Sequence, residues 1–116
     1  MTANRNAAVT SDHPQGEREP IGELDLVIHA PARLAIVTML HVAGGADFVF
    51  LQKQTGLTRG NLSSHLGKLE AAGYISVEKA FVDRVPRTLM TLTDAGREAF
   101  AQYRRQMRKR LDHLPD

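Results

Sequence analysis

The sequence predicts a small, mainly helical α+β domain. Apolar residues recur at helical spacing in three segments, and two β-rich runs flank one short polar turn. The chain has 116 residues, which is enough for one small domain and not for two. Hydrophobic residues make up 42% and charged residues 24%, so an ordinary globular core is expected.

The first 20 residues differ from the rest of the chain. Residues 1–20 contain Asn, Thr, Ser, Gln, Pro and Gly, with Val9 as an isolated apolar residue. Such a segment buries too little apolar area to offset the entropy of ordering. We therefore expect a disordered tail over 1–20 and the ordered domain over 21–116.

A first helix is expected to begin at Pro31, which suits a first helical turn because its missing N–H costs nothing there. Leu34, Val37 and Leu40 share one face of this helix, and the pair of glycines at 44–45 ends it. The preceding residues 24–29 either add a helical turn or pack as an arm.

A second, short helix follows over residues 48–55. Asp47 is a good N-cap for it, and Gly56 ends it.

Thr58 then caps a third helix over 58–72. Leu62, Leu66 and Leu69 form one apolar stripe along it, and Gly73 supplies its left-handed stop.

The hydrophobic period then changes from helical to alternating. Residues 74–78 alternate as a strand with one buried face, residues 83–86 read as a turn, and 88–93 form a second β-rich run. These runs predict one hairpin.

The last helix is expected over 94–113, capped by Thr93 with Asp94 in its favourable first turn. Its apolar stripe is longer than a small core can cover, which suggests a partner helix from a second copy about a two-fold axis. The predicted dimer interface comprises Leu24, Ile28, Phe100, Tyr103, Met107 and Leu111.

Residues 51–62 follow the logic of a helix-turn-helix. Leu51, Leu57 and Leu62 would pack the two helices together, and Gly56 takes the strained turn. Gln52 follows Leu51 at a position where a helix-turn-helix usually has a small residue, which is a mild departure from the motif. A helix-turn-helix followed by a hairpin is the winged-helix arrangement.

The outward face of the third helix is small and polar. Relative to Leu62, a rotation of 100° per residue places Gly60, Ser64, Gly67 and Ala71 opposite the core, and no acidic residue occurs before Glu70. A helix that enters the major groove needs little bulk, hydrogen-bonding groups and positive charge near phosphates. The helix residues predicted to bind DNA are Thr58, Arg59, Asn61, Ser63, Ser64 and Lys68, with Asn61 and Ser64 assigned to base edges.

The hairpin tip carries Arg84 and Arg87 around Pro86. In a wing over 82–88 these arginines would reach phosphates or the minor groove. The alternative is a solvated turn, or an Arg87 that pairs with Asp83.

Residues 24–100, about two thirds of the chain, resemble the winged-helix DNA-binding transcriptional regulators of the MarR/ArsR-like group. The matching pieces, in order, are HAPARLAI (29–36), GLT (56–58), NLSSHL (61–66), KLEAAGY (68–74) and LTDAGR (92–97). The resemblance implies a dimeric transcriptional regulator, more often a repressor, that binds double-stranded DNA. An unknown small-molecule effector is compatible with it.

Other functions find little support. The chain has no cysteine, and its five histidines show no metal-ligand spacing, so no metal or cofactor is expected. Residues 63–65 (Ser-Ser-His) are consecutive on a helix, where their side chains diverge, so no catalytic site is expected. No apolar stretch reaches the length of about 20 residues needed for a membrane span, and the cytoplasm is the expected location. The alternative function is a winged-helix module for protein interaction without DNA binding.

Overall fold

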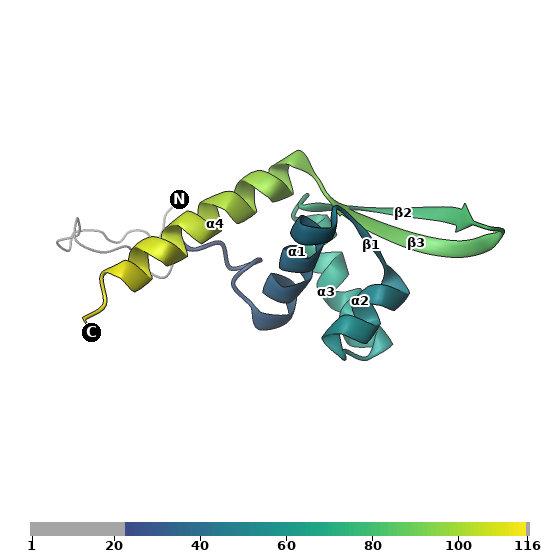
Figure 1. Ribbon diagram of the computed structural model, residues 1–116, viewed down its shortest axis with the longest axis horizontal. Coiled ribbons are helices and arrows are strands. Elements are labelled where there is room, and N and C mark those ends of the chain that lie inside the picture. The colour runs from purple at the N-terminus through teal and green to yellow at the C-terminus, as the bar shows by residue number, and fades with distance from the viewer. Residues whose placement is uncertain (1–22, 116) are drawn as a thin grey trace, which may run out of the picture.

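The computed structural model describes residues 23–115 (Figure 1). Its elements are, in chain order, α1 (Pro31–Ala43), β1 (Ala46–Asp47), α2 (Phe48–Thr55), α3 (Arg59–Ala71), β2 (Ile75–Val82), β3 (Val85–Leu92) and α4 (Asp94–Asp112). This order confirms the predicted winged helix-turn-helix fold. The tail predicted over 1–20 lies outside the described residues.

The helix boundaries follow from the capping residues that the sequence indicated. Pro31 lies in the first turn of α1, and Gly44 ends that helix in the left-handed conformation with φ of 80°. Side-chain oxygens cap the other three helices by accepting a backbone N–H bond, Asp47 from Phe50, Thr58 from Asn61 and Thr93 from Gly96. The predicted ends of α3 and α4 are therefore right to within one residue.

The sheet contains three antiparallel strands in the order β1-β3-β2. β2 and β3 pair along their full length, from Ile75 opposite Leu92 to Val82 opposite Val85. The short strand β1 pairs with β3 at Met90 and Leu89 and was not predicted. A strand of two residues has no periodicity from which it could be detected.

The hairpin turn is shorter than predicted. Only Asp83 and Arg84 connect the strands, with φ of 52° and 68°, the backbone of a type I′ turn. Pro86 was wrongly assigned to the turn and lies within β3, opposite Phe81. Proline is tolerated there because β1 pairs only near Leu89 and leaves that edge of β3 uncovered.

Residues 23–30 form an arm, the second of the two alternatives for this segment. Asp25 organises it, because its carboxylate accepts hydrogen bonds from the backbone N–H of Val27 and from the hydroxyl of Tyr74. That hydroxyl bond, with burial, raises the pKa of Tyr74 to about 12. The arm thereby buries Leu24 and Ile28 in the protein core.

One core is shared by the arm, all four helices and the base of the hairpin. Its fully buried side chains are Ile28, Ile36, Val37, Leu40, Leu51, Leu62, Leu69 and Met90. The arm supplies Ile28 and the sheet supplies Met90, so residues far apart in the chain meet there. This core holds α3 by its leucine stripe and leaves the other face of that helix exposed.

The junction between the hairpin and α4 is tightly packed. A Cβ atom at Gly96 would collide with the carbonyl oxygen of Tyr74 and lie 2.9 Å from its carbonyl carbon. Thr93 strengthens the junction, since its backbone N–H donates to Tyr74 and its hydroxyl donates to Gly73. Figure 1 shows that α4 runs from this junction away from the hairpin.

No helix within residues 23–115 is long and apolar enough to cross a membrane.

Candidate nucleic-acid interface

The face of α3 that points away from the core matches the surface predicted for DNA contact. The residues opposite the leucine stripe are all exposed, as are those at its edges: Gly60, Asn61, Ser63, Ser64, Gly67, Lys68 and Ala71. The first turn of α3 contains no acidic residue, and Lys68 adds a positive charge near its end. This face therefore combines small size, hydrogen-bonding groups and positive charge.

The start of α3 is held by two contacts. The hydroxyl of Thr58 accepts the backbone N–H of Asn61 at 3.1 Å. Thr58, Arg59 and Gly60 are exposed, so the positive end of the helix dipole faces solvent. The guanidinium of Arg59 lies over the ring of Phe48, 5.5 Å from its centroid. Thr58 thus positions the helix, and Phe48 orients the charge that begins it.

Arg33 joins α1 to the arm and to α3, a role that the sequence reasoning missed. Its Nη1 donates to Nδ1 of His65 at 3.1 Å, and its Nε donates to the carbonyl of Val27 at 2.5 Å. Burial and the charges of Arg33 and Lys68 lower the pKa of His65. Arg33 lies within the matching piece 29–36, but no spacing rule links it to a histidine 32 residues later.

The wing presents one arginine at its tip. Arg84 is exposed and has φ of 68°, in a turn type that favours glycine at this position. Arg87 lies further back on β3, half-buried and opposite Ala80. Among residues 23–115, neither ion pair joins Arg87 to Asp83, the alternative considered for this turn. A charged residue in a strained position is a common sign of a functional contact.

The apolar residues predicted at a dimer interface divide into two groups. Leu24, Ile28, Phe100 and Tyr103 are buried inside the protomer, because the arm folds against α4 of the same chain. Tyr103 also forms a 2.7 Å hydrogen bond with Nδ1 of His29. Among the predicted interface residues, this leaves half-buried Met107 and exposed Leu111 to offer a surface to a partner.

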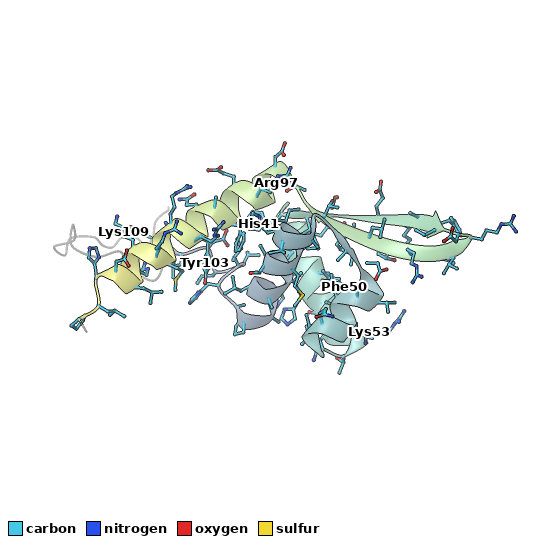
Figure 2. All side chains as sticks on the ribbon, in the orientation of Figure 1. His41, Phe50, Lys53, Arg97, Tyr103 and Lys109 are labelled. Carbon is cyan, nitrogen blue, oxygen red and sulfur yellow. The ribbon has the colours of Figure 1, made fainter. Side chains whose placement is uncertain are left out.

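Lysine side chains lie in the last turns of both α2 and α4. Figure 2 shows Phe50 and Lys53 at α2, and Tyr103 and Lys109 along α4. Lys53 is exposed in the last turn of α2, within the helix-turn-helix, and adds a positive charge that was not singled out in the sequence.

Among residues 23–115, no three His, Asp or Glu side chains are grouped so that they could hold a metal ion.

Comparison with known proteins identifies relatives with this arrangement. The winged helix DNA-binding domain family matches residues 32–111. An uncharacterised protein of Methanocaldococcus jannaschii is 31% identical over 77 residues, which make up 66% of this chain and 84% of that protein.

Solved structures of regulators are also similar. A transcriptional regulator homologue from Pyrococcus horikoshii OT3 aligns with a TM-score of 0.74 at 34% identity, over 79% of this chain and 91% of that chain. NadR, solved in complex with 4-hydroxyphenylacetate, aligns with a TM-score of 0.63 at 25% identity, over 75% of this chain and 61% of that chain. The transcriptional repressor BigR from Xylella fastidiosa shares the fold, with a TM-score of 0.56 at 22% identity, over 78% of this chain and 84% of that chain.

Proposed function

We propose that this chain, which belongs to the winged helix DNA-binding domain family, is a transcriptional regulator of the MarR/ArsR-like group and acts as a homodimeric repressor. In this proposal α3 enters the major groove, and the wing over 82–88 lies on the adjacent backbone and minor groove. The observation that carries it is the exposed, small and acid-free first part of α3, opposite a fully buried leucine stripe.

The side chains of α3 are assigned to two kinds of contact with DNA. Asn61 and Ser64 carry short hydrogen-bonding groups and are assigned to base edges, whereas Arg59, Ser63 and Lys68 are assigned to phosphates. Backbone N–H groups in the first turn of α3, next to the Thr58 N-cap, add to phosphate binding. Arg84 and Arg87 extend the phosphate contacts to the wing.

Salt dependence of duplex binding tests the phosphate contacts. We expect Lys68→Ala and Arg84→Ala each to lower the slope of log K against log salt by about one unit, because each removes one phosphate contact. Arg108→Ala is the matched control, since Arg108 is an exposed arginine on α4, away from α3 and the wing. Fluorescence anisotropy with a labelled duplex measures the slope, and an unchanged slope removes the residue from the phosphate set.

Sequence choice tests the base contacts. Selection of bound genomic fragments by the purified protein should recover an inverted repeat with half-sites about 10 base pairs apart, or a multiple of that spacing. Asn61→Ala should relax the recovered sequence and leave the salt slope unchanged. If the wild-type protein shows no salt-sensitive duplex binding at micromolar concentration, the alternative of a protein-interaction module is favoured instead.

The end of α4 supports the dimer. Leu111 is 59% exposed and Leu114 64%, and both continue the stripe that begins with buried Phe100. Leu26 on the arm is also exposed, at 57%. A second copy that packs along α4 would cover these side chains and place two recognition helices on one duplex.

Oligomeric state is measured by size-exclusion chromatography with light scattering. Leu111→Glu should convert a dimer into a monomer because it places a charge in the proposed contact. Val42→Glu is the control, since Val42 is 79% exposed at the end of α1, outside this surface. A wild-type monomer at high micromolar concentration would contradict the dimer.

A repressor of this kind acts by occupying DNA that polymerase needs, so loss of binding should raise expression of a reporter placed behind the selected operator. The likeness to NadR, solved with 4-hydroxyphenylacetate, supports a small-molecule effector as part of the proposal. Ligand-dependent release of the labelled duplex is the measurement that checks it.

A further inference from the structure

The outer half of the β2–β3 hairpin carries exposed apolar side chains that pack against nothing in the protomer's core. Phe81 is 76% exposed, and its neighbours Val82 and Val85 are 47% and 45% exposed. The hydrophobic core reaches only to Val77 and Met90 along the hairpin. Four residues further out, the phenyl ring of Phe81 therefore lies in water.

Strand register separates this half of the wing into two surfaces. Paired residues share a face and successive pairs alternate, so the buried pair Val77 and Met90 defines the core side. The next pairs on that side are Lys79 with Thr88 and Phe81 with Pro86, which we call the core-side wing surface. The opposite surface carries the pairs Glu78 with Leu89, Ala80 with Arg87 and Val82 with Val85.

The core-side wing surface lies on the same side of the sheet as α3. The leucines of α3 belong to the core cluster that contains Ile75 and Met90, so α3 covers this side of the hairpin base. Figure 1 shows that the hairpin extends past α2 and α3. A duplex bound by α3 and continuing toward the wing tip would meet the core-side surface first.

Charge favours an anionic partner on this surface. Lys79 is its charged residue, whereas the carboxylate of Glu78 belongs to the opposite surface. Arg84 stands at the turn just beyond Phe81 and Pro86, next to Asp83, the other residue of that turn. An apolar ring between two cations suits a polyanion that also offers apolar groups, as the deoxyribose walls and base steps of the minor groove do.

We propose that Phe81, backed by Pro86, makes an apolar contact in the minor groove beside the site of α3, with Lys79 on a flanking phosphate. This rests on the proposed function, because it requires α3 to hold a duplex. Phenylalanine and proline are residue types that enter the minor groove as wedges at a base step. Such a contact releases no counterion, so it contributes affinity that does not depend on salt.

Anisotropy titration of the full-length protein with a labelled 30-base-pair duplex of mixed sequence, at several salt concentrations, tests this contact. We expect Phe81→Ala to weaken binding about tenfold at every salt concentration, with an unchanged slope. Lys79→Ala should instead lower the slope by about one unit. Val42→Ala is the matched control, since Val42 is an exposed apolar residue at the end of α1, outside α3 and the wing.

Each outcome is decisive. A Phe81→Ala protein that binds as the wild type does overturns this inference and leaves the proposed function intact. Equal losses in Phe81→Ala and Val42→Ala also overturn it, because the loss of affinity would then not be specific to the wing. Wild-type self-association that Phe81→Ala abolishes, with duplex binding unchanged, would assign the ring to a protein contact. A wild-type protein that binds no duplex overturns the proposed function as well. Circular dichroism confirms that the exposed-site variants fold.

Discussion

The arm and the wing use their side chains in opposite ways. In the arm, Asp25 bonds to Tyr74 and to backbone N–H groups, and His29 bonds to Tyr103. In the outer wing, Phe81 and Arg84 extend into solvent. We therefore expect substitutions in the arm to change the stability of the fold and substitutions in the wing to change DNA binding.

The junction between the hairpin and α4 should give the largest loss of stability. Gly96→Ala forces a Cβ against the backbone of Tyr74, and we expect the free energy of unfolding to fall by about 3 kcal/mol. Gly67→Ala is the control, because a Cβ there meets nothing within 4 Å and should raise stability by about 0.5–1 kcal/mol. Urea denaturation measures both, and equal effects would contradict the packing described for Gly96.

The arm should give the next largest loss. Asp25→Ala leaves the hydroxyl of Tyr74 and the N–H of Val27 without their acceptor, and we expect a loss of about 2 kcal/mol. Glu23→Ala at the exposed start of the arm should change stability by less than about 0.5 kcal/mol. Duplex binding by folded Asp25→Ala should match the wild type. A binding defect without a stability defect would place the arm in the DNA contact.

Features that depend on residues close together in the chain were predicted well from the sequence. The caps Asp47, Thr58 and Thr93 were identified because each acts on its own next turn, and local signals of this kind are readable. The exposed face of α3 followed from helical geometry alone. Both depend on residues close together in the chain.

Contacts between distant segments were missed for the same reason. Nothing near Arg33 in the sequence indicates that it meets His65 on another helix. The burial of Leu24 and Ile28 against their own chain was likewise unreadable, because an apolar residue looks the same whether its partner is α4 or a second protomer. At Pro86 a local signal gave a wrong prediction. Its composition indicated a turn, but the residue lies within β3 and pairs with Phe81.

Acid should produce a smaller loss of stability through His65. Arg33 donates to its Nδ1, and burial, Arg33 and Lys68 lower its pKa, so the folded protein favours the neutral ring. The unfolded chain binds a proton near pH 6.5, so this stabilisation is complete above pH 6.5 and is lost as the pH falls through the lowered pKa. Urea unfolding at pH 7.5 and 5.5 should show a larger loss for the wild type than for His65→Gln. The same loss in both proteins would assign the pH effect to other groups.

At the wing tip we expect the smallest change in the free energy of unfolding, and a gain rather than a loss. Arg84→Gly relieves the left-handed backbone in a turn that favours glycine, so we expect a gain of about 0.5 kcal/mol. The same change removes a phosphate contact and should lower the salt slope by about one unit. Val85→Ala, beside the turn, should leave the salt slope unchanged. Unaltered duplex binding by Arg84→Gly would show that the arginine serves no contact.

The two glycines on the outward face of α3 have a consequence for how such a regulator diversifies. Beyond the adjacent residues and the helix backbone itself, no atom stands within 4 Å of a Cβ at Gly60 or Gly67, so either position accepts a side chain without rearrangement of the fold. Each addition would reach toward a different base pair. If α3 reads the operator as proposed, these two open positions are where new operator preferences would arise, by mutation or by design, while the buried leucines stay unchanged.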